Sequence, residues 1–247
     1  MTVSRALNRN GYVNPDVRDR VLASASRLNY RPNVLARSLR QQSTKAVGVL
    51  LPDIANPFSP ELVQGIESVL LDNGYDCILT ASLRNGEREK SALTAFLDHR
   101  VDGILVATRE TRAGNEALVE AVKRGTQVGT IGRLLNHDRV DHVTADHWRG
   151  AFDMVAHLIA LGDKKIGFLG ASIVMGPKGE SPKYSTQEDG HEGMVRLLTP
   201  RSRPTAEQGR IAGQMLVERL THQYEGLLRD QVLPCKLIVR KSCGATS

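Results

Sequence analysis

Hydrophobic and polar positions change in regular blocks along most of the chain, and the blocks predict a succession of strands and helices. Short apolar runs rich in Val, Ile and Leu are typical of buried strands. Between them, apolar residues recur every three or four positions, as on one face of a helix. The predicted strands are residues 46–51, 75–81, 101–107, 127–131, 140–145, 165–169 and 233–239, and the predicted helices are residues 60–73, 87–100, 116–123, 148–161 and 206–225. Such alternation implies βαβ units and a parallel sheet, an α/β fold.

The pattern ahead of the first strand differs, because it predicts short helices and no strand. Val3 and Leu7 are four positions apart and predict a short helix over residues 2–8 with both on one face. Asn14 is a favourable N-cap, and the apolar positions after it predict a helix over residues 15–29.

Two further segments stand outside the alternating blocks. Pro32 can start a third short helix that runs to residue 40, and residues 41–45 are polar and indicate a linker. Residues 171–204 are rich in glycine and proline with little periodic apolar content. So long a stretch without predicted elements is unusual inside a compact domain.

Charge changes the picture for the N-terminal 45 residues. They hold nine basic residues against Asp16 and Asp19, a net charge of +7, whereas the whole chain of 247 residues is +6. The rest of the chain therefore sums to −1. Positive charge gathered on one small helical unit is the expected footprint of binding to nucleic-acid phosphates.

Composition and motif spacing exclude several classes of protein. No apolar run approaches the ~20 residues of a membrane span, and the start lacks the apolar core of a secretory signal. Three unpaired cysteines fit a reducing cytosol and are expected to be idle thiols. The histidines do not fall at metal-ligand spacing, and His142 and His147 are expected at the surface or at helix caps. Without a phosphate loop or a nucleophile motif, we expect a cytoplasmic protein that is not an enzyme and needs no cofactor.

Several motifs together resemble the lactose-repressor (LacI/GalR) family of bacterial transcription regulators. The resemblance covers residues 2 to about 170 and then about 199 to 243. The matching pieces are residues 2–8 (TVSRALN), 13–15 (VNP), 30–39 (YRPNVLARSL), 47–58 (VGVLLPDIANPF), 100–105 (RVDGIL), 157–162 (HLIALG) and 165–170 (KIGFLG).

The resemblance implies a double-stranded DNA operator as partner. Residues 2–8 resemble the recognition helix of a helix-turn-helix, which lies in the major groove, where an arginine such as Arg5 can donate to guanine. Residues 32–40 resemble the hinge helix, in which Leu39 would wedge into a minor-groove base step. An ordinary polar helix face and an ordinary core leucine are the alternative interpretations. The predicted DNA-binding residues are Thr2, Ser4, Arg5, Asn8, Tyr12, Asn14, Tyr30, Asn33, Ala36, Arg37 and Leu39.

For the body, the resemblance implies a fold like that of periplasmic sugar-binding proteins, with a small-molecule effector, a sugar, in a cleft between two subdomains. Ligands of open sheets bind beyond the carboxyl ends of the strands. The residues expected there are Asp53, Asn56, Phe58, Asp146 and Trp148. For each of them, helix capping or packing is an equally good explanation.

The sequence also departs from the family. It begins inside the recognition helix, so the helix-turn-helix is expected to be partial, and Gly190 stands where the family has an effector-binding arginine. The second subdomain is expected to be incomplete. The helix at 206–225 and the strand at 233–239 would then lack the middle of the second sheet that they pack on, and apolar residues such as Met215 and Leu216 would be left partly exposed.

The expected division is therefore residues 1–45 for DNA binding, 46–145 for the first α/β subdomain and 146–247 for a shortened second one. The function that fits best is a sequence-specific repressor that acts as a homodimer under control of a sugar-like effector. Two alternatives stay open: a small-molecule-binding α/β protein without working DNA binding, and a non-functional remnant.

Overall fold

A computed structural model of the chain describes residues 2–8, 11–30, 43–108, 111–162, 201–202 and 204–239. The predicted hinge helix, the predicted strand at 165–169 and nearly all of the glycine- and proline-rich stretch lie outside these residues. Among the described residues, none of the helices has the length and apolar character needed to span a bilayer.

Two helices are described in the N-terminal segment, and both were predicted. They are α1 (Thr2–Asn8) and α2 (Pro15–Arg27), and the side chain of Asn14 caps α2 by accepting a 2.9 Å hydrogen bond from the N–H of Asp16. Val3 and Leu7 lie four positions apart on α1, as predicted. Val3 is exposed and Leu7 half-buried, whereas Ala6 is buried.

The body is built on one six-stranded parallel sheet. Its strand order is β2-β1-β3-β4-β5-β7. The strands are β1 (Ala46–Leu51), β2 (Asp76–Ala81), β3 (Gly103–Val106), β4 (Gln127–Ile131), β5 (Asp141–Ala145) and β7 (Asp230–Leu233). Every neighbouring pair is parallel, as the alternating pattern predicted.

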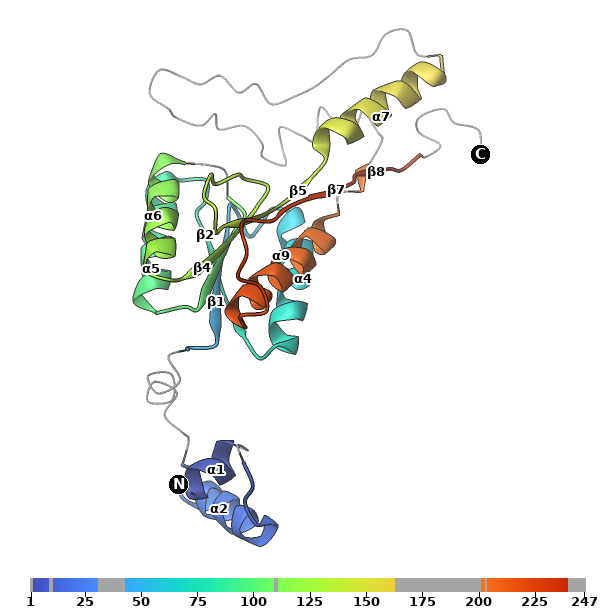
Figure 1. Cartoon of the computed structure of the whole chain (residues 1–247). Coiled ribbons are helices and arrows are strands. Elements are labelled where there is room, and N and C mark those ends of the chain that lie inside the picture. Colours follow the sequence, from blue (N-terminus) through green and yellow to red (C-terminus); the bar gives the residue numbers. More distant parts are fainter. Residues whose placement is uncertain are drawn as a thin grey trace.

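Helices cover both faces of this sheet. Helices α4 (Phe58–Asp72) and α9 (Thr205–Leu220) lie on one face, and α5 (Gly86–Asp98) and α6 (Arg112–Lys123) on the other (Figure 1). Each face has its own apolar core. Val49 and Leu51 belong to the core under α4 and α9, whereas Leu50, between them, belongs to the core under α5 and α6. Alternate residues of one buried strand thus serve opposite faces.

The position of α9 and β7 corrects an expectation. They do not lie apart with exposed apolar faces. α9 packs on α4 and on the first sheet, and β7 pairs with β5 in that sheet. Met215 and Leu216 of α9 are accordingly buried. In the described residues, the six-stranded sheet with α4, α5, α6 and α9 forms one unit, here called the first lobe, which the chain leaves after β5 and re-enters at α9.

Glycines allow α9 and α4 to approach closely. A Cβ atom added at Gly209 would lie 2.2 Å from the carbonyl oxygen of Leu62, and one added at Gly65 would lie 2.1 Å from that of Ala206. No side chain fits at either place. The contact between the two helices is thus made backbone against backbone, which leaves little freedom in how α9 docks.

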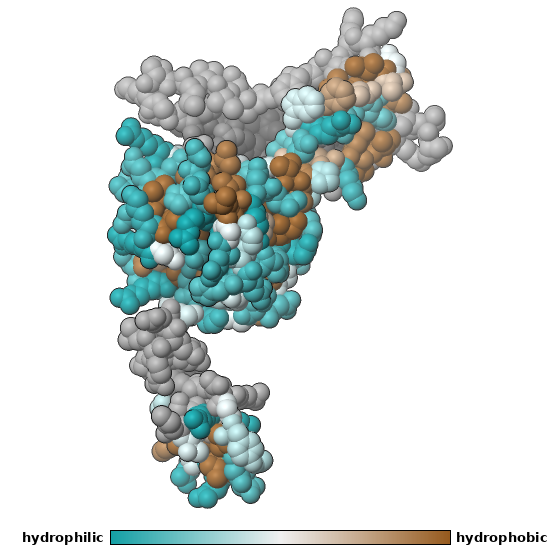
Figure 2. Space-filling view, in the orientation of Figure 1, coloured by the Kyte–Doolittle hydropathy of each residue, from teal (hydrophilic) through white to brown (hydrophobic). Residues whose placement is uncertain are grey.

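Exposed apolar residues instead gather on α7 (His147–Ala160), which extends away from the sheet (Figure 1). Trp148, Phe152 and Ile159 recur along one side of this helix and are all exposed, and hydrophobic surface gathers over it in Figure 2. Two short strands, β6 (Arg201–Ser202) and β8 (Lys236–Leu237), form a separate antiparallel pair. The predicted strand at 233–239 is divided because Pro234, after β7, has no N–H to donate.

Candidate DNA-binding surface and effector-binding edge

Helix α1 carries the predicted base-reading residues. Thr2 and Arg5 are both exposed, and Ser4 and Asn8 belong to the same helix. An exposed guanidinium on a short helix can form the paired hydrogen bonds that guanine accepts in the major groove. The structure therefore leaves Arg5 available for the role that the sequence predicted.

Three further predicted DNA contacts flank α2. Tyr12 and Tyr30 are largely exposed on either side of it. Asn14 is exposed too, but its amide oxygen is already engaged in the cap of α2. The remaining predicted contacts lie outside the described residues: Asn33, Ala36, Arg37 and Leu39.

On the effector side, three predicted residues follow β1 and shape the start of α4. The Asp53 carboxylate accepts a 2.9 Å hydrogen bond from the N–H of Ala55, and the Asn56 amide oxygen accepts one of 3.1 Å from the N–H of Phe58. These are turn and cap bonds, so the alternative explanation applies to both side chains. Phe58 is the first residue of α4, and its ring is close to half exposed.

The two other predicted residues follow β5. Asp146 is the N-cap of α7 and accepts a 2.8 Å hydrogen bond from the N–H of Arg149. Trp148 is 74% exposed, and its ring stacks on that of Phe152 with the centroids 5.7 Å apart. An exposed aromatic pair beside a strand end offers a flat surface on which a ring can stack.

All five residues lie at the carboxyl edge of the sheet, but they form two groups. The strand order places β3 and β4 between β1 and β5. At about 4.8 Å per strand, the ends of β1 and β5 are roughly 14 Å apart. Phe58 and Trp148 are thus at opposite sides of the edge. A ligand the size of a sugar could not contact both of them at once.

A buried ionic network, which sequence reasoning missed, fills the space between the two groups. Arg133, after β4, donates from Nη1 to Glu89 Oε1 at 2.6 Å and to Thr108 Oγ1 at 2.7 Å. Its Nη2 donates to Asn115 Oδ1, and Thr111 Oγ1 donates to Glu89 Oε2 at 3.0 Å. The side chains of Arg133 and Glu89 are 1% and 2% exposed. The network ties α5, α6 and the ends of β3 and β4 together.

A sequence signal for this network existed. Glu89 precedes Leu93 and Phe96 by four and seven positions, so it lies on the buried side of α5. An acidic residue on that side needs a buried cationic partner. Nothing local identified Arg133 as that partner, because 44 residues separate the two.

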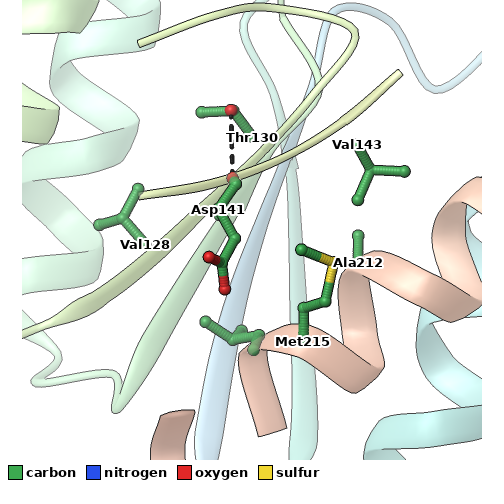
Figure 3. A pocket seen from close by; sticks show the side chains of 8 residues that line it. Val128, Thr130, Asp141, Val143, Ala212 and Met215 are labelled. Carbon is green, nitrogen blue, oxygen red and sulfur yellow. Dashed lines mark hydrogen bonds between the residues drawn. The ribbon is translucent and has the colours of Figure 1, made fainter. Parts of the chain in front are cut away.

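Two hollows in the described part of the chain lie elsewhere. One of about 10 Å³ lies between α9 and strands β4 and β5, among Val128, Thr130, Asp141 and Met215 (Figure 3). It has room for about one water molecule and no ligand. The other, of about 920 Å³, opens at the amino edge of the sheet beside Lys45 and Asp102, opposite to the predicted effector residues.

The remaining histidine, cysteine and acidic side chains of the described residues offer no further reactive site. In the described residues no group of three His, Cys, Asp or Glu side chains could hold a metal ion. Burial, followed by the charge of Glu67, raises the pKa of the Cys77 thiol to about 11, so it stays protonated at neutral pH. The expectation for His142 is wrong. It is buried in β5, with Nδ1 2.9 Å from Asp230 Oδ1 on the neighbouring strand β7.

Comparison with known families gives two matches on this chain. The profile of the family described as periplasmic binding proteins and sugar binding domain of LacI family matches residues 44–193. The profile described as bacterial regulatory proteins, lacI family matches residues 1–33.

Individual relatives agree with these profiles. The chain is 32% identical over 238 residues to catabolite control protein A of Priestia megaterium, covering 96% of this chain and 69% of the relative. It is 32% identical over 202 residues to the ribose operon repressor of Halalkalibacterium halodurans, covering 80% and 55%. Across four such relatives the chain spans between 50% and 71% of the relative's length.

Solved structures share the fold. A lac repressor dimer bound to operator and the anti-inducer ONPF superposes with a TM-score of 0.74 at 18% identity, covering 98% of this chain and 94% of that one. A complex of the transcriptional regulator CelR with cellobiose superposes with a TM-score of 0.64 at 19% identity, covering 98% and 95%.

Proposed function

The chain belongs to the LacI family of bacterial regulatory proteins, and on that premise we propose that it is a sequence-specific transcriptional repressor. It acts in the cytoplasm, as a homodimer on operator DNA, and performs no enzymatic reaction. The observation that carries the proposal is the match of residues 1–33 to the family's regulatory segment, together with the +7 charge of residues 1–45. The named relatives are a catabolite control protein and operon repressors.

In this proposal α1 lies in the major groove with Arg5 at a base edge. Thr2, Ser4 and Asn8 contact neighbouring bases or phosphates from the same helix. The segment with Asn33, Ala36, Arg37 and Leu39 enters the minor groove, and Leu39 opens a base step there. Tyr12, Asn14 and Tyr30 contact the backbone. Phosphate contacts place the protein on the duplex, whereas Arg5 supplies sequence preference.

We place a sugar-like effector at the carboxyl edge of the first lobe. Support comes from the family description of residues 44–193 and from the exposed rings of Phe58 and Trp148, either one of which suits the apolar face of a sugar. The carboxylates of Asp53 and Asp146 each keep acceptor capacity beyond their single cap bond. Because only one lobe flanks this edge in the described residues, binding is expected to be weak.

The homodimer is proposed to form through the β2 side of the first lobe. β2 is an edge strand, and Ile78 and Leu79 on it are more than a third exposed. Leu71, near the end of α4, and Leu83, after β2, add further exposed apolar surface at that side. Natural proteins usually cover such edges, and a second copy of the same surface does so with twofold symmetry.

Selection of binding sites from a pool of random duplexes tests the proposal. The wild-type chain should enrich one sequence family with two related half-sites, as expected for a symmetric dimer. Recovery of sequences no different from the starting pool would overturn sequence-specific regulation as its function.

A further inference from the structure

Three consecutive residues before β1 converge on one carboxylate, that of Asp102. The N–H of Thr44 donates to Asp102 Oδ1 at 2.8 Å and the N–H of Lys45 donates to Oδ2 at 3.0 Å. The hydroxyl of Ser43 also donates to Oδ2, and that of Thr44 lies 2.9 Å from Oδ1. Asp102 is half-buried and directly precedes β3, the neighbour of β1. One side chain of the body therefore holds the last three residues of the linker.

The backbone at this place is in a conformation that needs such support. Lys45 has a φ of +56°, in the left-handed region that residues with a side chain rarely adopt. Such a conformation persists only where its surroundings fix it. Here the carbonyl of Lys45 accepts a 2.7 Å hydrogen bond from the N–H of Asp76, and its Nζ donates to the Tyr75 hydroxyl at 3.1 Å. The chain is turned sharply just before β1 and held from both sides.

This turn is where the DNA-binding segment joins the body. Residues 1–33 match the regulatory segment of the family, and the chain enters the first strand at Ala46. Residues 43–45 are therefore the last part of the connection between the DNA-binding segment and the body, and the Asp102 carboxylate holds them.

We propose that Asp102 is a positioning residue that fixes the exit direction of the DNA-binding segment, and through it the spacing of half-sites that the dimer accepts. This inference rests on the proposed function. In a dimer, two segments must reach two half-sites at once, so a fixed exit from each body selects one separation. If the exit were loose, the two segments could bind half-sites at several separations. The effective concentration of the second segment at any one separation would then be lower.

The Asp102→Asn variant is the sharpest test, because it keeps the shape of the side chain. Its amide retains one acceptor oxygen, but its NH2 group faces a donor that Asp102 had satisfied. Asp98→Asn is the matched control. It removes one negative charge at the exposed end of α5, four residues before Asp102.

A first measurement needs no DNA. Hydrogen exchange of the amides of Thr44 and Lys45 should be faster in Asp102→Asn for at least one of the two, by roughly tenfold, because a hydrogen bond to a charged acceptor is lost. Exchange within β1 and thermal unfolding should stay near wild type. The Asp98→Asn control should show wild-type exchange throughout. Unchanged exchange at both amides would show that the carboxylate does not hold the linker.

The second measurement compares affinities for duplexes with the selected half-sites moved apart or together by one and two base pairs. Wild type and Asp98→Asn should each lose roughly tenfold or more at the wrong spacings, because the half-sites no longer match the geometry of the dimer. Asp102→Asn should bind all spacings within about threefold of one another, with weaker binding at the preferred one. A wild-type spacing profile in this variant would overturn the inference alone, whereas wild-type protein without sequence preference would overturn the proposed function as well.

Discussion

Arg219 of α9 and Asp141 of β5 form a buried bidentate ion pair across 78 residues of sequence. Arg219 Nε lies 2.7 Å from Asp141 Oδ2, and Nη2 lies 2.7 Å from Oδ1. Arg229, just before β7, adds a second guanidinium, with Nη2 2.7 Å from the same Oδ2. Asp141 thus fastens both α9 and β7 to the sheet, which is how the returning chain is held in the first lobe. We call these three residues, Asp141, Arg219 and Arg229, the clasp.

Replacing Arg219 by Met should destabilise the chain by roughly 3 kcal/mol or more. The substitution leaves the buried Asp141 carboxylate with only part of its compensation, and uncompensated buried charge is costly. Unfolding by urea, followed by circular dichroism, gives the free energy. Arg210→Met on the same helix is the control. Arg210 is exposed and pairs with Glu207 at 2.7 Å, and its loss should leave the midpoint where it was. Equal effects of the two substitutions would contradict the clasp.

The clasp also predicts how stability depends on acid. Burial raises the pKa of Asp141, but the hydrogen bonds from Arg219 and Arg229 outweigh it, so the pKa lies below its ordinary value. The unfolded chain then takes up this proton at a higher pH than the folded chain. The stabilisation is present above the unfolded pKa of about 3.9 and is lost as pH falls through the lower folded value.

Asp141→Asn should therefore lower the free energy of unfolding at neutral pH and flatten its decline below about pH 4. Some decline should remain, because the pKa of Glu218 is also lowered: burial raises it, and hydrogen bonds from Gln214 and Arg229 outweigh that. Urea melts at a series of pH values measure both slopes. A slope in the variant as steep as in wild type would show that Asp141 does not carry this pH dependence.

The network of Glu89 and Arg133 should behave as one unit. Glu89→Gln and Arg133→Met should each cost roughly 3–5 kcal/mol, because each leaves a buried group without its charge partner. The double variant should cost clearly less than the sum. The exposed pair Arg124 and Glu120 on α6, 2.9 Å apart, is the control and should show a coupling of about 0.5 kcal/mol or less. Additive costs at Glu89 and Arg133 would contradict the network.

The docking of α9 on the first lobe can be tested by cutting the chain. A site for a specific protease inserted after residue 185 divides α7 from α9 in sequence. After cleavage, the two pieces should still elute together, because α9 and β7 are held by the core and by the clasp. Gly209→Val should separate them, since a Cβ there would lie 2.2 Å from the carbonyl oxygen of Leu62. If the two pieces separated in the cleaved chain without this substitution, α9 would not be docked on the first lobe as described.

Local patterns predicted most of the fold because each strand and helix of the first lobe is marked by its own periodicity. The run at residues 46–51 and the glycine after α4, Gly74 with a φ of +72°, are examples. The placement of α9 and β7 was not predicted. Nothing near Arg219 indicates that its partner is Asp141, and a helix with buried apolar residues fits the face of any sheet.

The candidate sites were predicted in position more than in detail. Residues after β1 and β5 do lie at the carboxyl edge, as the rule for parallel sheets requires. The sequence could not show that Asp53, Asn56 and Asp146 would be engaged in turns and caps, because that depends on backbone direction. Nor could it show that β3 and β4 would separate Phe58 from Trp148.

The most direct test of regulator function is the ratio of affinities for a selected site and for a scrambled duplex of the same length at physiological salt. We predict a ratio of roughly 10³ or more for the wild-type chain. Arg5→Ala should lose about 1–3 kcal/mol on the selected site and relax preference at one base pair. Arg20→Ala, which removes an equally exposed charge from α2, should weaken both duplexes alike. A ratio near one for the wild-type chain would contradict the account.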